Sequence, residues 1–189
     1  GYTASFAACA SLRSTANCAG SRHRHGCRII IIVPAHRFPS VQAGRQAGMS
    51  TMSKQTVSLI GVPTDIGAGH RGASMGPEAL RVANLGPRLE QRGLTVIDRG
   101  NLQGPFNPWQ PPVNGYRHLD QVVAWNMAVY TAVQQELKAG YLPLMLGGDH
   151  CLAIGSISAV ADHCREVGKQ LRVLWLDAHS DFNTAEATP

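Results

Sequence analysis

The residues that are the clearest candidates for metal binding or catalysis follow a short apolar run near the end of the printed sequence. Asp177, His179 and Asp181 alternate with other residues directly after residues 171–176. Such a run is typical of a buried strand, and open parallel sheets hold their chemistry at the edge where the strands end. His150 follows a second apolar run in the same way, after Gly147-Gly148-Asp149. These oxygen and imidazole ligands suit Mn²⁺, Fe²⁺ or Zn²⁺ better than a soft metal.

The spacing of the aspartates predicts a shared metal site only if the chain curls after the strand. In an extended strand Asp177 and Asp181 would lie about 13 Å apart, which is too far for one ion. In a curled segment, positions i and i+4 approach to roughly 6 Å. His179 would then diverge and could bind a second ion, bridged by Asp177, at the ~3.5–4 Å separation of two-metal sites. Because two divalent ions carry more charge than two aspartates neutralise, we expect further carboxylates after residue 189.

Alternating strand and helix patterns position these residues at one edge of a sheet. We expect a Pro-rich irregular segment over residues 100–118. The apolar periodicity predicts strands over residues 56–62, 94–98, 141–146 and 171–176, and helices over residues 77–89, 119–138 and 151–167. This alternation predicts a parallel sheet with right-handed crossovers, which brings both ligand groups to the same edge.

A glycine pattern in the first loop, Gly67-x-Gly69-x-x-Gly72, matches the spacing of dinucleotide sites. In such sites the glycines follow the strand at once and open the helix. Here four residues intervene, and Pro77 after Gly76 is the better helix start. We therefore expect a tight loop and no nucleotide site.

The basic charge of the chain is confined to its N-terminal arm. Residues 1–54 contain seven of the 17 Lys and Arg residues and none of the 12 acids. Residues 55–189 therefore hold ten basic and 12 acidic residues, so no nucleic-acid partner is inferred. The arm loosely resembles a transit peptide, but Met49 or Met52 could also be the natural start. We expect residues 1–54 to be a disordered or non-native arm and residues 55–189 to be the N-terminal portion of one α/β domain.

The cysteines and apolar runs exclude two further classes. The five cysteines contain no Cys-x-x-Cys pair, which argues against a zinc knuckle or redox pair and favours a reducing cytoplasm. Cys151, beside His150, is expected to be a small packing residue. No apolar run approaches the ~20 residues of a membrane helix, so no membrane partner is expected.

Two separated motifs resemble the ureohydrolase family and, within it, the arginases. They are Gly147-Gly148-Asp149-His150 and Asp177-Ala178-His179-Ser180-Asp181-Phe182-Asn183, in that order. Residues 61–81 and 152–156 are also similar to the family. The resemblance covers about residues 55–189. It implies a three-layer α/β/α fold with a mostly parallel sheet, truncated here after about the fourth strand.

The resemblance implies hydrolysis of L-arginine to L-ornithine and urea by a hydroxide activated by two Mn²⁺ ions. His150, Asp177 and Asp181 would bind one ion, and Asp177 and His179 would bind the other. Asp181 would also be catalytic, because it would orient the hydroxide through a hydrogen bond.

The same resemblance implies the substrate contacts. Asn183 would contact the α-carboxylate of the substrate, which favours arginine because agmatine has no such group. Ser180 and Thr188 would lie at the edge of the substrate site. The expected partner is thus a small molecule, L-arginine, and the complete enzyme would be a homo-oligomer, a trimer or hexamer.

The chain also departs from the family pattern. The family's later Asp-x-Asp motif and its Ser-Gly-Asn-x-His segment do not occur within the 189 residues. The family order places late strands between the third and fourth strands, so we expect a gap in this sheet. Residues 1–189 alone are therefore expected to fold poorly and to be inactive.

Four other functions compete with this interpretation. Within the family, the substrate could be agmatine or a guanidino acid. A mononuclear zinc deacylase also uses Asp-x-His at a strand end. An Fe(II) oxygenase could use His150, His179 and Asp181, although the strand–helix alternation argues against its usual scaffold. Last, the chain could be a non-catalytic metal-binding remnant.

Overall fold

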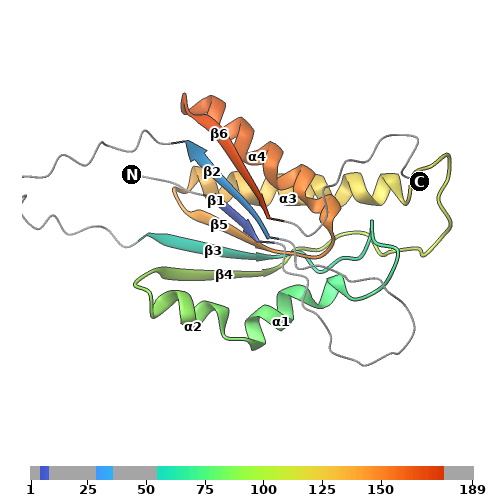
Figure 1. Cartoon of the computed structure of the whole chain (residues 1–189), viewed down its shortest axis with the longest axis horizontal. Helices are drawn as coiled ribbons and strands as arrows, with labels where there is room; N and C mark the ends of the chain where they lie inside the picture. Colours follow the sequence, from blue (N-terminus) through green and yellow to red (C-terminus); the bar gives the residue numbers. More distant parts are fainter. Residues whose placement is uncertain (1–4, 9–28, 36–54, 177–189) are drawn as a thin grey trace, which may run out of the picture.

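The computed structural model describes residues 5–8, 29–35 and 55–176, which form a β-sheet with helices on both faces (Figure 1). The strands are β1 (Ser5–Ala8), β2 (Ile29–Ala35), β3 (Thr56–Gly61), β4 (Thr95–Asn101), β5 (Leu142–Leu146) and β6 (Gln170–Leu176). The α-helices are α1 (Gly76–Val82), α2 (Leu85–Glu90), α3 (Leu119–Lys138) and α4 (Ala153–Glu166). Two short 3₁₀ helices, η1 (Ala73–Met75) and η2 (His150–Leu152), precede α1 and α4.

The four strands predicted from the sequence are β3 to β6, and they all run in one direction. β3 pairs in parallel with β4 and with β5. β1 is parallel to β5, and β2 is antiparallel to both β1 and β6, so β6 runs in the direction of β5. The carboxyl ends of β5 and β6 therefore point to the same edge of the sheet, as the α/β prediction requires.

The strands β1 and β2 lie in the N-terminal arm, where no strand was predicted. The sheet order is β4-β3-β5-β1-β2-β6, so these strands occupy the positions between β5 and β6. The gap that we expected there is absent. The run Ile29 to Val33 consists of β-branched residues, which favour a pleated, half-buried strand. The division of the chain at residue 54 stays a prediction.

Each face of the sheet has its own apolar core. Figure 1 shows α1 and α2 on one side of the sheet and α3 and α4 on the other. Leu59 of β3 packs with the leucines of α1 and α2, while its neighbour Ile60 packs with α3 and α4. Because successive side chains of a strand point to opposite faces, β3 contributes to both cores. This arrangement confirms the three-layer α/β/α prediction.

The helix predicted over residues 77–89 is divided into α1 and α2, which corrects that prediction. Asn84 adopts a left-handed conformation with φ of 61° between the two helices. Pro87 follows in the first turn of α2, where its missing N–H costs no helical hydrogen bond. The helix predicted over residues 151–167 likewise begins with the tighter turn η2 before α4.

The helix predicted over residues 119–138 is confirmed as α3 with the same bounds. β4 extends to Asn101, into the segment predicted to be irregular. The rest of that segment is irregular, as expected from its prolines, apart from an isolated bridge between Val113 and Tyr116. Within the described residues, none of the helices combines the length and the apolar character needed to span a lipid bilayer.

Candidate metal centre

His150 lies in η2, directly after the sheet edge at which β5 ends. Asp149 is the N-cap of η2, with an extended backbone, and its Oδ1 accepts a hydrogen bond of 2.9 Å from the Cys151 N–H. A side-chain acceptor at this position satisfies a backbone donor that the helix leaves unpaired. The cap therefore sets the backbone direction from which the His150 ring projects.

Asp149 also joins η2 to the loop that follows β3. Its second oxygen, Oδ2, accepts a hydrogen bond of 2.6 Å from the Gly67 N–H. The Asp149 N–H donates to the Thr64 carbonyl at 3.1 Å. The Asp149 side chain is only 8% exposed, so these bonds form largely away from water, where an unpaired carboxylate would be costly. The Gly67 N–H is engaged here, which agrees with the expectation of a tight loop at the glycine pattern.

Gly148 allows this close contact between the two loops. A Cβ atom at this position would lie 2.4 Å from the Thr64 carbonyl oxygen and 2.6 Å from that of Val62. Both atoms belong to the backbone and cannot rotate away. Glycine at this position thus permits the approach of the backbone on which the Asp149 contacts depend.

Further hydrogen bonds hold the loop after β3 in place. The Asp65 carboxylate accepts bonds from the Ser74 N–H at 2.8 Å and from the Ser74 hydroxyl at 2.6 Å. The His118 Nδ1 atom lies 2.9 Å from the Ile66 carbonyl oxygen. The Asn107 side-chain amide donates to the Asp65 carbonyl at 2.8 Å. These contacts tie residues 64–67 to both η1 and the Pro-rich segment, so the loop beside His150 has several anchors.

The His150 ring lies against the ring of Trp175 in β6. The ring centroids are 4.8 Å apart and the ring planes are inclined by 47°. Trp175 precedes Asp177 by two residues. The contact therefore brings His150 close to the strand that leads into the second ligand motif, as the sequence analysis requires for a shared site.

The other predicted site residues lie outside the described residues. They are the expected metal ligands Asp177, His179 and Asp181 and the expected substrate contacts Ser180, Asn183 and Thr188. Within residues 5–8, 29–35 and 55–176, the structure contains no cluster of three or more His, Cys, Asp or Glu side chains suited to a metal ion. Thus His150 is the one predicted ligand that the described part of the chain places.

Two residues of this region have roles that the sequence analysis did not assign. Asp149 was treated as part of a motif, although an Asp directly before a helix start is a common N-cap and could have been recognised as one. The sequence predicts a buried strand over residues 171–176, but β6 is mostly exposed. No local pattern predicts the contact of Trp175 with His150. Cys151 is partly buried, and its Sγ would lie 3.2 Å from a Cβ at Gly67, in agreement with a small packing residue.

Comparison with known proteins places this arrangement in a family. The model of the arginase family matches residues 55–189. This chain belongs to the arginase family. An arginase of Brevibacillus brevis is 39% identical over 135 residues, which are 71% of this chain and 44% of the relative. An arginase of Bacillus subtilis is also 39% identical, over 136 residues and 44% of its length.

Solved arginase structures share the fold of this family member. The arginase of Bacillus caldovelox superposes with a TM-score of 0.60 at 36% identity, covering 71% of this chain and 44% of that one. The arginase of Bacillus cereus gives a TM-score of 0.52 at 38% identity, covering 58% of this chain and 36% of that one. The chain thus spans less than half the length of the arginases it matches.

Proposed function

We propose that the protein carrying this chain hydrolyses the guanidino group of L-arginine to give L-ornithine and urea. The observation that carries the proposal is the contact between His150 and Trp175, which brings His150 close to the strand that precedes the second motif of this arginase-family chain. The relatives from Brevibacillus brevis and Bacillus subtilis are named arginases, which supports the same reaction. L-Arginine is thus the proposed small-molecule partner.

The predicted donors of this chain suit Mn²⁺ and would supply part of a two-ion centre. His150 stands at the edge where β5 ends, and the chain leaves β6 one residue before Asp177. His150, Asp177 and Asp181 would hold one ion, and Asp177 and His179 the other. Imidazole and carboxylate are ligands that Mn²⁺ accepts. When bound, two such ions would make hydroxide available at neutral pH.

The remaining residues would orient the reactants. Asp149 holds the backbone of His150, as its two hydrogen bonds indicate. The Asp181 carboxylate would accept a hydrogen bond from the attacking hydroxide and so direct it to the guanidinium carbon. The Asn183 amide would donate to the α-carboxylate of arginine, with Ser180 and Thr188 at the edge of the same site.

The test uses the complete protein with Mn²⁺ and compares L-arginine with agmatine. We expect urea release from arginine in large preference to agmatine. The Asn183→Asp variant places a negative charge where the α-carboxylate would bind. Loss of one charge-assisted contact, about 1.5–3 kcal/mol, would lower kcat/KM for arginine by roughly 10- to 150-fold. The rate with agmatine should not fall in parallel.

Asn114→Asp is the matched control, because it makes the same chemical change in an exposed loop. Its kcat/KM for arginine should equal that of the unaltered protein. Hydrolysis of agmatine without hydrolysis of arginine would replace the proposal with the agmatinase alternative. One Zn²⁺ per chain with no urea release would instead favour the deacylase. The homo-oligomer and the cytoplasmic location stay predictions.

A further inference from the structure

The contact between His150 and Trp175 joins the ends of two strands, β5 and β6, that are not neighbours in the sheet. β5 and β6 are separated by β1 and β2 in the strand order. Even so, the ring of His150, after β5, lies with its centroid 4.8 Å from that of Trp175 in β6. This distance is within the range in which aromatic rings attract one another beyond simple burial.

The two neighbouring contacts restrict different degrees of freedom of His150. The N-cap bonds of Asp149 hold the backbone of η2. They do not set χ2, the rotation of the imidazole about the Cβ–Cγ bond. This torsion has a broad, roughly two-fold preference in histidine. An aromatic ring packed against the imidazole, as Trp175 is, restricts this rotation. The orientation of a ligand histidine depends on the groups around it, most often a hydrogen-bond partner of its second ring nitrogen.

We propose that Trp175 is a positioning residue that aims the His150 imidazole at the metal pair. The inference rests on the proposed function, in which His150 is a metal ligand. Trp175 stands two residues before Asp177 in the sequence, so its contact links His150 to the strand that precedes the second ligand motif. The tryptophan thereby links His150 to the strand before Asp177 without binding a metal itself.

The first test measures binding of Mn²⁺ to the complete protein by calorimetry. Trp175→Leu keeps an apolar side chain but removes the aromatic ring. From the usual strength of ring pairs, we expect Mn²⁺ affinity to fall by about 2- to 10-fold. Trp175→Phe keeps a ring and should restore most of this loss.

Trp109→Leu is the matched control. Trp109 is 38% exposed and Trp175 is 37% exposed, so the two substitutions remove similar amounts of buried surface. Trp109 contacts the Arg71 guanidinium at 5.0 Å rather than a proposed ligand. Its replacement should leave Mn²⁺ affinity unchanged.

A second measurement detects the contact without metal. In protein with ¹³C-labelled histidine, the ring protons of His150 should carry a ring-current shift that is retained in Trp109→Leu and absent from Trp175→Leu. Unaltered protein is sufficient if Trp175→Leu does not fold, since His150 protons without such a shift would overturn the inference.

The outcomes separate the inference from the proposed function. Equal Mn²⁺ affinities for the Leu and Phe variants and the unaltered protein would overturn the role of Trp175 and leave the metal centre standing. Failure of the unaltered protein to bind Mn²⁺ would overturn both. A graded loss, with Phe between the unaltered protein and Leu, supports the positioning role.

Discussion

At Gly148 the space that a side chain would fill is already occupied by backbone. The carbonyl oxygens of Thr64 and Val62 lie where a methyl group would have to go. The neighbouring residue, Asp149, makes the hydrogen bonds that hold Gly67 and Cys151. At the residue scale, a glycine and a carboxylate therefore act together to hold the backbone of His150.

We predict that Gly148→Ala lowers the free energy of unfolding by about 1–3 kcal/mol, the usual cost of overpacking. Gly69→Ala is the control, because a Cβ at Gly69 meets nothing within 4 Å. Urea denaturation of both variants would check the difference. Equal stability of the two alanine variants would show that the loops do not approach each other as described.

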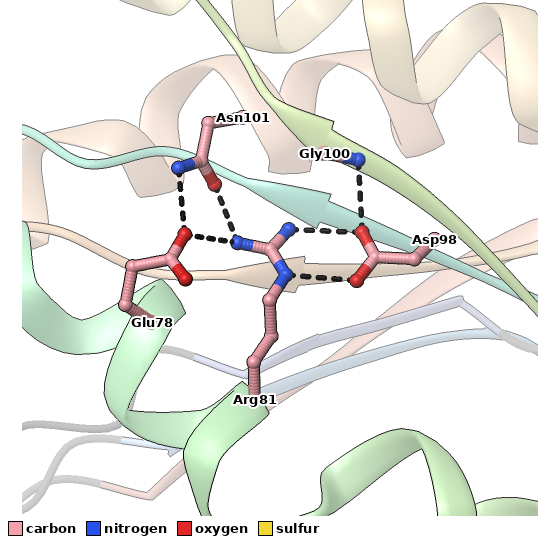
Figure 2. A network of polar contacts seen from close by, with 5 residues as sticks. All are labelled: Glu78, Arg81, Asp98, Gly100 and Asn101. Carbon is pink, nitrogen blue, oxygen red and sulfur yellow. Dashed lines mark hydrogen bonds and ion pairs between the residues drawn. The ribbon is translucent and has the colours of Figure 1, made fainter.

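At the scale of elements, Arg81 links α1 to β4 through hydrogen bonds, as Figure 2 shows. Arg81 donates to Asp98 through Nε at 2.8 Å and Nη2 at 2.9 Å. Its Nη1 donates to Glu78 and to the Asn101 side chain, each at 2.7 Å. The hydrogen bonds with Arg81 hold the pKa of the Asp98 carboxyl below its ordinary value. Thus α1 and β4 are joined by a two-pronged contact that only arginine supplies.

We expect Arg81→Lys to lower the free energy of unfolding by about 1 kcal/mol. Lysine keeps the charge but loses the two-pronged geometry, and solvent screens part of the interaction at this half-exposed site. Arg92→Lys, at an exposed position, should change stability by less than about 0.5 kcal/mol. Chemical denaturation of both variants measures the difference, and equal effects would contradict a special role for Arg81.

The lowered pKa of Asp98 also determines the pH range over which its interaction with Arg81 stabilises the fold. Its stabilising effect is complete above the unfolded pKa, about 3.9, and is lost as the pH falls through the lower folded pKa. The stability difference between Arg81→Lys and the unaltered protein should therefore shrink on acidification below about pH 4.

At the scale of the whole molecule, the layer formed by α3 and α4 contains a buried histidine. His163 is 8% exposed, and its Nδ1 atom has no hydrogen-bond partner among the described residues. Burial lowers the pKa of His163, and the positive charges of Lys169 and Lys138 act in the same direction, against the opposite effect of Glu166. The folded chain therefore holds this imidazole neutral at pH values where the unfolded chain protonates it.

We predict that global stability falls as the pH drops below about 6.5, the ordinary pKa of histidine. The unfolded chain then binds a proton that the folded chain does not, until the pH reaches the lower folded pKa. This single group contributes a slope of at most about 1.4 kcal/mol per pH unit. Thermal or urea unfolding between pH 7 and pH 5 measures the effect.

His163→Gln should reduce this slope, because glutamine does not titrate. His70→Gln serves as the control, since His70 lies in an exposed loop. An unchanged slope in His163→Gln would show that other groups determine the acid sensitivity.

Much of the fold follows from local patterns in the sequence. The alternation of apolar strands and amphipathic helices predicts β3 to β6, α3 and the parallel direction of the strands, because period and chain order determine them. The place of His150 at the sheet edge follows from the same pattern. The split between α1 and α2 has local signals that the apolar periodicity overrides, since Asn tolerates the left-handed backbone found at Asn84 and Pro87 follows closely.

The sequence by itself determined the family and the order of its two motifs along the chain, and it predicts the metal ligands. These features reside in residue types and spacings along the chain. Only the tertiary structure decided that Asp149 accepts a hydrogen bond from Gly67, that Trp175 packs against His150 and that β1 and β2 lie between β5 and β6. Such contacts join residues far apart in the sequence. Their partners are chosen by the packing of the whole sheet and its layers, which no local pattern records.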